Sequence, residues 1–512
     1  MANRFIKAMA LLAAAVVLCA SLFGCASATV DGGKATTGAT QGNTVAPTQE
    51  PPAAEKIEGT VKIVFPGDEP KDMAGVKAAL EEKLKADGLD LKLEFTYFPW
   101  DQYDNKVNLI PASGEKYDLL WTFISSISSM VAKKGLMPLD EYLDQYAPVL
   151  LKNIPVDTWK DCTIAGKIYG IPTIVPMADH NRFTAIRGDL RKKYGIPEIN
   201  TIADFENYMV TLKQNIPDIT YLPDDRMIFR EYGDIVMPIQ NGARGLAYLD
   251  PADPNMKVMS YYESDIFKNM VNLKKKWFDM GLLPKPNQIK DQEVSFSSGQ
   301  IGAIWSVVLK TTERIDAFKT ACPDGEIEDV FLYRDKPRYK YETTSSMLSL
   351  FSTSESPKQS IAFVNWFRSN QDNYDIMSYG VKDVNYKLDG DAVSYDGIAS
   401  DKVYTQIFWA WDDINFKRFS KWISADYIDY LKNWDKDAIS VPSLGFKFDS
   451  ASVKTEIAQI QALEEEYAVP AINGYIAYDD FYDEFIKKLK AAGLDKVLAE
   501  MQTQIDAFKA AK

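Results

Sequence analysis

The spacing of apolar residues at the start of the folded body predicts a strand, a helix and a second strand in succession. Val61, Ile63 and Phe65 are apolar at every second position, and apolar residues then recur every fourth position from Val76 to Leu84, which places them on one helix face. A second alternation runs from Leu89 to Tyr97. Strands that alternate with helices are typical of an open, largely parallel sheet covered on both faces, so an α/β fold is expected.

Further segments carry signals for individual elements. A helix through Tyr103 and Val107 is expected to stop at Pro111, and residues 117–121 (YDLLW) have the composition of a buried strand. Thr201 is a suitable N-cap for the helix predicted to follow it. The other expected elements are a strand at 183–186, a helix end, glycine turn and strand over 296–305, helices near 357–370 and 402–411, and helices through the last sixty residues.

The first 57 residues are expected to lie outside the folded body. Residues 1–24 combine two basic residues with an apolar run too short to span a bilayer, which is the pattern of a secretory signal peptide. The motif LFGC at 22–25 resembles the lipobox of bacterial lipoproteins, which implies that Cys25 is lipid-modified and becomes the first mature residue. Residues 25–57 read as a disordered tether, because they offer almost no large apolar surface to bury.

Two alternatives to lipidation stay open. The A-x-A site at 26–28 could be cleaved and release a free secreted protein, or Cys25 could be an unmodified signal-peptide cysteine. The composition of the tether favours the anchored form, because a flexible spacer between a lipid and a folded body has this character.

Composition excludes several classes of function. Without the two basic residues of 1–24 the formal net charge of −14 becomes −16, and so acidic a chain is a poor candidate for nucleic-acid binding. No phosphate-binding G-x-x-x-x-G-K-[ST] loop occurs, so any ATP hydrolysis would belong to a partner. About 450 residues follow the tether, which exceeds a single hydrophobic core and predicts two lobes.

Histidine and cysteine are too scarce for a metal centre. His180 is the only histidine, which excludes multi-histidine metal sites, and we interpret it as a loop or cleft-lining residue. Cys162 and Cys322 could form one disulfide or remain two buried thiols. The acidic residues of 389–396 (DGDAVSYD) do not have EF-hand spacing and are interpreted as an exposed loop. No metal or cofactor is expected.

A series of short motifs, in order along 58–512, resembles extracellular solute-binding proteins of family 1, the maltose-binding-protein-like receptors of ABC sugar importers. These motifs are YDLLW at 117–121, GLMPLD at 135–140, GKIYGIP at 166–172, LRKKYGIP with TIADF over 190–205, and FSSGQIGAIW at 296–305. The part from about Trp366 through GFKFD at 445–449 to the end is similar to the extended C-terminal region of Gram-positive lipoprotein members.

The resemblance implies a two-lobed periplasmic-binding-protein-like fold of type II, with a mostly parallel sheet flanked by helices in each lobe and a hinge between the lobes. It places lobe one at 58–178 and 343–382, and lobe two at 179–342 and 383–512. It also implies a receptor, anchored on the extracellular side of the cell membrane, that captures a carbohydrate between closing lobes. The receptor would deliver it to the transmembrane permease subunits of an ABC transporter, which has a separate ATPase. The sequence itself does not specify the oligomeric state, and a monomer is expected because it suits two lobes that close.

Carbohydrate sites combine aromatic platforms with planar polar groups, because sugars present flat C–H faces and a rim of hydroxyls. Aromatic residues at predicted strand ends, and charged residues where the resemblance places a lobe crossing, are therefore the candidates, each against the alternative of a packing or surface role. The candidate ligand-binding residues are Trp100, Trp121, Asp179, Arg182, Trp305, Trp409 and Trp411.

Trp409 and Trp411 lie on the same side of the chain only if their segment is extended. A helical segment would point the two indoles apart.

A surface glycoside hydrolase with paired carboxylates is the alternative function, because acidic residues are plentiful. The absence of a catalytic motif and the match to a transport family argue against an enzyme. A third possibility keeps the fold and exchanges the sugar for a peptide.

Overall fold

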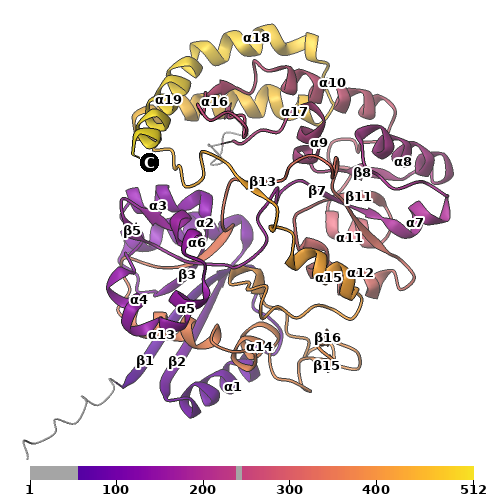
Figure 1. The fold of residues 1–512 in the computed structure, drawn as a ribbon. Helices are drawn as coiled ribbons and strands as arrows, with labels where there is room; N and C mark the ends of the chain where they lie inside the picture. Colours follow the sequence, from indigo (N-terminus) through magenta and orange to yellow (C-terminus); the bar gives the residue numbers. More distant parts are fainter. Residues whose placement is uncertain (1–55, 238–244, 512) are drawn as a thin grey trace, which may run out of the picture. The chain divides into compact units, whose positions relative to one another are not determined.

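The computed structural model describes residues 56–237 and 245–511 (Figure 1). The predicted lipidation site, Cys25, and the signal segment lie outside the described residues. The described chain is organised around two sheets, each with its own helices and hydrophobic core, which confirms the two-lobed α/β architecture.

The sheet of the first lobe has five strands in the order β2-β1-β3-β14-β6. Its strands are β1 (Ile57–Pro66), β2 (Leu89–Phe98), β3 (Leu119–Phe123), β6 (Ile171–Pro172) and β14 (Ser346–Leu350). Its helices are α1 (Met73–Ala86), α2 (Trp100–Ser113), α3 (Ile127–Ala132), α4 (Asp140–Tyr146), α5 (Pro148–Asn153), α6 (Val156–Asp161), α13 (Pro357–Phe367) and α14 (Gln371–Tyr379). The alternating and helical patterns of the N-terminal segment therefore produce the expected elements β1, α1 and β2.

The sheet of the second lobe has four strands in the order β12-β7-β11-β8. Its strands are β7 (Phe183–Arg187), β8 (Thr220–Leu222), β11 (Ile301–Ser306) and β12 (Ile327–Val330). The helices that accompany it are α7 (Gly188–Lys193), α8 (Ile202–Asn215), α9 (Asp225–Tyr232), α10 (Asp265–Asp279), α11 (Gln292–Ser297), α12 (Lys310–Ala321) and α15 (Ala425–Lys432). The predicted cap is present, because the Thr201 hydroxyl accepts from the Asp204 backbone N–H and the Asp204 carboxylate accepts from that of Thr201.

Both sheets are mixed, whereas mostly parallel sheets were expected. β1 pairs in parallel with β2 and β3, but β14 runs antiparallel to β3 and β6. In the second lobe only the β8–β11 pair is parallel. β14 follows a segment that returns from the other lobe, so its direction is set by the crossing and not by a helix that connects neighbouring strands.

Three segments cross between the lobes beside one another. The Ile174 N–H donates to the Asp412 carbonyl oxygen at 2.8 Å, and the Asp179 N–H donates to the Tyr339 carbonyl oxygen at 2.8 Å. The segment 173–179 therefore lies between the segments near 339 and 412. The lobe boundaries remain predictions, and the packing of residues 386–411 into the first core leads us to propose a third boundary near Asp412 instead of 382.

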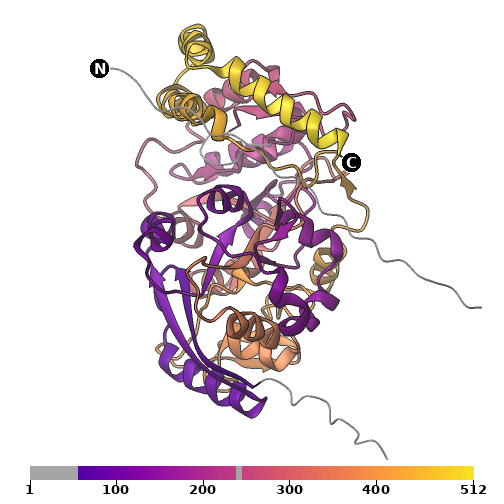
Figure 2. The same ribbon diagram turned by 90° about the vertical axis from the view of Figure 1, so that its left-hand side faces the viewer.

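The C-terminal region adds a helical layer to the second lobe (Figures 1 and 2). Its helices are α16 (Lys454–Leu463), α17 (Val469–Ile472), α18 (Tyr478–Ala491) and α19 (Leu494–Ala510). Ile460, Phe485 and Met501 are fully buried in the second core, so the region is part of this lobe's hydrophobic interior. Among the described helices, none combines the length and the apolar character that a membrane span requires.

Two helix predictions differ from the structure. α2 continues through Pro111 to Ser113, because the proline lies in the last turn, where its missing N–H removes one hydrogen bond near a helix end that Gly114 terminates at φ 77°. Residues 402–411 contain only the short 3₁₀ turn η2 (Phe408–Ala410) instead of a helix. Residues 402–411 instead pack into the core of the first lobe, and these long-range contacts take the place of the local hydrogen bonds that a helix would form.

Candidate functional site

Three predicted tryptophans from distant parts of the first lobe meet in one cluster. Trp100 begins α2 directly after β2, Trp121 lies in β3, and Trp409 lies in η2. The Trp100 and Trp409 rings are stacked with centroids 5.7 Å apart. The Trp121 ring is roughly perpendicular to both, with its centroid 5.0 Å from that of Trp409 and 5.7 Å from that of Trp100. β2 and β3 present their carboxyl ends here, the edge at which open α/β sheets bind ligands.

The members of this tryptophan cluster differ in exposure. Trp100 is 52% exposed and Trp409 is half-buried, whereas Trp121 is 1% exposed. Phe123, which the sequence analysis did not select, is 44% exposed, and its ring centroid lies 4.2 Å from that of Trp121. Trp100, Trp409 and Phe123 can therefore present aromatic surface, while Trp121 supports them from below.

The position of Phe123 could have been found from the sequence. It lies two residues after Trp121 in the same strand, so the two side chains are on the same side of the sheet. The signal that could have identified Phe123 is its place at the last position of β3, two residues beyond the YDLLW motif at 117–121.

Trp411 does not join the cluster. Its indole packs between Phe65, at 5.4 Å, and Phe367, at 5.9 Å, and its Nε1 donates to the Ser378 hydroxyl at 3.0 Å. It is 1% exposed. The turn at η2 separates the two indoles, so the extended arrangement that would place Trp409 and Trp411 together is absent, and Trp411 is a core residue.

Trp305 lies near the end of β11 in the second lobe and is 36% exposed. Its Nε1 donates to Gln292 Oε1 at 3.0 Å. Lys310 Nζ and the Arg314 guanidinium lie 5.7 and 5.8 Å from its ring centroid. The ring is thus held in place by polar neighbours and keeps exposed surface, as an aromatic platform requires.

Asp179 and Arg182 belong to a buried ion-pair network at the first lobe crossing. Asp179 contacts Arg182 (Nε–Oδ1 3.2 Å) and Arg230 (Nη1–Oδ2 2.9 Å), and Arg182 is also paired with Asp234. Both residues are almost completely buried, which overturns the alternative of a surface ion pair. Their charges are engaged with protein groups, so this geometry favours a structural role, and ligand binding by either one stays a prediction.

His180 and Cys162 are buried, and Cys322 is partly buried. The His180 Nδ1 lies 3.1 Å from the Pro176 carbonyl oxygen, and burial lowers the pKa of its imidazole to about 4. Cys162 and Cys322 are both free thiols, so the disulfide is absent; Cys162 is buried as expected for a free thiol, whereas Cys322 is only partly buried. Burial raises the pKa of Cys162 far above its usual value. Within 56–237 and 245–511, no group of three or more His, Cys, Asp or Glu residues is placed to hold a metal ion.

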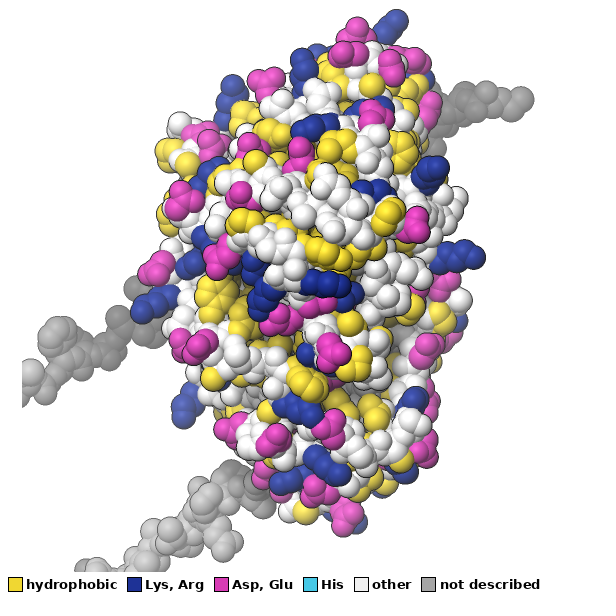
Figure 3. Space-filling view, turned by 90° about the vertical axis from the view of Figure 1, so that its right-hand side faces the viewer, with side chains coloured by type: hydrophobic (Ala, Val, Ile, Leu, Met, Phe, Trp, Pro, Cys, Tyr) yellow, Lys and Arg dark blue, Asp and Glu magenta, His cyan; other side chains and the backbone are white. Residues whose placement is uncertain are grey.

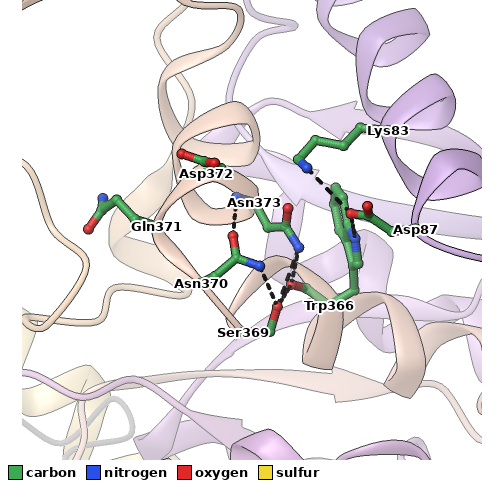
Figure 4. Close-up of a pocket in the computed structure, with 8 residues that line it drawn as sticks. All are labelled: Lys83, Asp87, Trp366, Ser369, Asn370, Gln371, Asp372 and Asn373. Atoms are coloured by element: carbon green, nitrogen blue, oxygen red, sulfur yellow. Dashed lines mark hydrogen bonds and ion pairs between the residues drawn. The ribbon is translucent and has the colours of Figure 1, made fainter.

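A wide polar pocket of about 520 Å³ lies elsewhere on the first lobe (Figure 4). It is formed by the ends of α1 and α13 and the start of α14, where the Trp366 Nε1 donates to Asp87 Oδ2 at 2.8 Å. Asp87 precedes β2 and Trp100 follows it, so the pocket and the tryptophan cluster lie at opposite ends of a strand roughly 30 Å long. The pocket is not part of the candidate site.

The surface of the described body carries both signs of charge. On the face shown in Figure 3, acidic and basic side chains are interspersed with hydrophobic ones. Such a mixed face provides no extended positive field for a polyanion.

Comparison with known families and structures gives a consistent result. A model of bacterial extracellular solute-binding proteins matches residues 67–374, and a domain of unknown function (DUF3502) matches residues 442–510. A carbohydrate ABC transporter substrate-binding protein of Streptococcus pneumoniae serotype 4 is 26% identical over 471 residues, which cover 88% of this chain and 90% of that protein.

Solved structures share the fold. The N-glycan transport solute binding protein NgtS of Streptococcus pneumoniae has a TM-score of 0.74 at 22% identity, covering 88% of this chain and 99% of that one. The same protein in complex with Man5GlcNAc has a TM-score of 0.68 at 22% identity, covering 89% of this chain and 99% of that one.

Proposed function

Because the chain belongs to the family of bacterial extracellular solute-binding proteins, we propose that it is the substrate-binding protein of an ABC transporter for a carbohydrate. Its ligand is an oligosaccharide, held between the two lobes and passed to the transmembrane permease subunits. The protein acts as a monomer and as a receptor, not as an enzyme. The similar S. pneumoniae protein is a carbohydrate ABC transporter substrate-binding protein, which supports this proposal.

The tryptophan cluster is the observation that carries the proposal. An oligosaccharide offers successive flat C–H faces, and Trp100, Trp409 and Phe123 offer successive exposed aromatic surfaces at the carboxyl edge of the first sheet. A peptide would instead be expected to use a row of unpaired backbone groups or a charged anchor.

The second lobe is proposed to close over the sugar with Trp305. Its ring is exposed and oriented by Gln292, Lys310 and Arg314. The three crossing segments provide the hinge, because movement of the lobes needs only small changes in a few residues of adjacent strands. The buried Asp179–Arg182–Arg230 network holds the end of the crossing segment 173–179 in the second lobe, so the lobes can move as rigid bodies.

We also propose that Cys25 anchors the protein to the outer face of the cell membrane, with residues 26–56 as the spacer. A Cys25→Ala variant should leave the membrane fraction and appear in the medium or as the unprocessed chain. Membrane association that is unchanged in this variant would contradict the anchor, without bearing on sugar binding.

The test of the function is a thermal-shift screen of residues 26–512 against mono- and oligosaccharides, with short peptides as controls. A ligand at a hundred times its dissociation constant should add about 2.7 kcal/mol to the free energy of unfolding, which raises the melting temperature. Recovery of the bound sugar intact would support a receptor. A sugar that is cleaved during incubation would support a glycoside hydrolase, and a shift with peptides alone would replace the substrate class.

A further inference from the structure

We propose that a small cavity between α2 and α3 is an additional subsite, which binds one neutral sugar ring at the end of the oligosaccharide. This inference rests on the proposed function and adds to it, because it assigns recognition of chain length to the first lobe. The cavity has a volume of about 200 Å³ and adjoins the tryptophan cluster through Trp121. Its size suits a single ring better than a whole oligosaccharide, whose sites are typically several hundred Å³.

The cavity lies at the end of the first lobe that faces the other lobe. It is lined by residues of α2, by the last residues of β3 and by α3. In Figures 1 and 2 this part of the first lobe is the part nearest to the C-terminal helices. A sugar chain that lies on Trp100 and Trp409 can therefore continue into the cavity without leaving the space between the lobes.

Two buried polar groups in its lining have no hydrogen-bond partner. Trp121 and Thr122 are 1% and 3% exposed, and the Trp121 Nε1 and the Thr122 hydroxyl are unpaired among the described residues. A buried donor without an acceptor costs about 1–3 kcal/mol, so most such groups in proteins are satisfied. Successive strand residues alternate between the two faces of a sheet, so only one of these groups, Trp121 Nε1 on the face that also carries Phe123, can gain an acceptor from an oxygen-rich ligand in the cavity.

The remaining lining indicates a neutral sugar ring. Phe123 provides an exposed aromatic face, and the carboxylate of Asp104 accepts no hydrogen bond from any described residue, so it is available to sugar hydroxyls. No Lys or Arg is among the described residues that line the cavity, and the nearby Lys133 is engaged with Asn108, its Nζ donating to Asn108 Oδ1 at 3.1 Å. The carboxylate of Asp104 therefore disfavours an anionic ligand. Ser129 adds a further hydroxyl at the rim.

Isothermal titration with two sugars of different length tests the subsite. Man1GlcNAc and Man5GlcNAc are the probes, and the variants are Asn108→Phe, which fills the cavity from α2, and Asn105→Phe, an exposed control on the same helix outside the lining. Wild type should bind the longer sugar more tightly. Asn108→Phe should raise the Kd for Man5GlcNAc about tenfold, equivalent to the loss of one or two hydrogen bonds, and leave Man1GlcNAc almost unchanged.

Asp104→Asn provides a second variant that keeps the shape of the side chain, and it should weaken the longer sugar selectively. Equal effects of Asn108→Phe on both sugars, no effect on either, or a wild type without preference for the longer sugar would each overturn the subsite. Failure of the wild type to bind any sugar of the thermal-shift screen would overturn the proposed function itself, and the subsite with it. Binding that depends on Trp100 but not on Asn108 would retain the function and remove the subsite.

Discussion

The ammonium group of Lys447 lies 3.2 Å from Oδ1 of Asp161, and this ion pair joins the C-terminal region to the first lobe. Asp161 ends α6 and is 1% exposed, and its Oδ2 accepts from the backbone N–H and the hydroxyl of Thr343 in the second crossing segment. One carboxylate therefore connects the first lobe, the hinge and the region that matches a domain of unknown function.

Removal of Lys447 should lower stability more than removal of an ordinary surface lysine. Lys447→Met leaves a buried carboxylate with only the Thr343 donors, and because Lys447 is partly exposed we expect a loss of about 1–2 kcal/mol, between the values of surface and buried pairs. Urea unfolding measures the loss. Lys496→Met is the control, because its partner Glu456 lies within the C-terminal region. Equal losses in the two variants would contradict a special role for the pair.

Trp100→Ala should weaken sugar binding with little effect on the fold. The side chain is 52% exposed, so its removal leaves little cavity, while a stacking platform is typically worth about 1–3 kcal/mol of binding free energy. Titration with the sugar identified in the thermal-shift screen gives the change in Kd. Trp411→Ala is the matched control and should show the opposite pattern, a loss of about 3–5 kcal/mol of stability with unchanged Kd for the folded protein. Normal binding by Trp100→Ala would show that this ring is not a platform.

Arg230→Met should be among the most destabilising single changes in the second lobe. Arg230 is fully buried, pairs with Asp179 and donates from Nε to the Leu332 carbonyl oxygen at 2.7 Å. Its loss leaves Asp179 buried with one arginine fewer, which typically costs about 3–5 kcal/mol. Chemical denaturation is the measurement.

Arg226→Met, on the same helix, provides the comparison for Arg230→Met, because the Arg226 side chain is 46% exposed. The double variant Asp179→Asn/Arg230→Met should lose less than the sum of the single losses. Strict additivity would show that the two charges are not coupled.

Stability should fall on acidification from pH 7 to pH 5 through His180. Burial lowers the pKa of His180 to about 4 in the folded protein, whereas the unfolded value is about 6.5, so the unfolded state binds the proton first. The contribution is present above the unfolded pKa and is lost as the pH falls toward the folded pKa, by about 2 kcal/mol at pH 5. Unfolding free energies of wild type and His180→Gln across this range measure it.

Wild type and His180→Gln must be compared with each other, because Glu342 changes the stability with pH in the opposite direction to His180. Burial raises the pKa of the Glu342 carboxyl to about 7, so the folded state retains a proton that the unfolded state has lost, and stability from this group falls as the pH rises from about 4.5 to 7. This slope is common to both proteins and cancels in their difference. Parallel pH profiles would contradict the assignment to His180.

The sequence by itself determined the features that depend on residues close together along the chain. The alternation and helical spacing of 57–98 specify β1, α1 and β2, because period 2 and period 3.6 are local properties of the backbone. The Thr201 cap follows from two side chains three positions apart. The signal-like and tether-like composition of 1–57 is likewise a local property, as are the aromatic residues at the strand ends of the first lobe.

Tertiary structure decided which of these aromatic residues share a site. Trp409 lies about three hundred positions after Trp100, and only the return of the chain to the first lobe brings the two rings within 5.7 Å. The η2 turn, not the spacing, separates Trp409 from Trp411. The antiparallel direction of β14 and the contact of Lys447 with Asp161 arise in the same way. Such contacts are selected by the packing of the whole chain, and short-range periodicity contains no information about them.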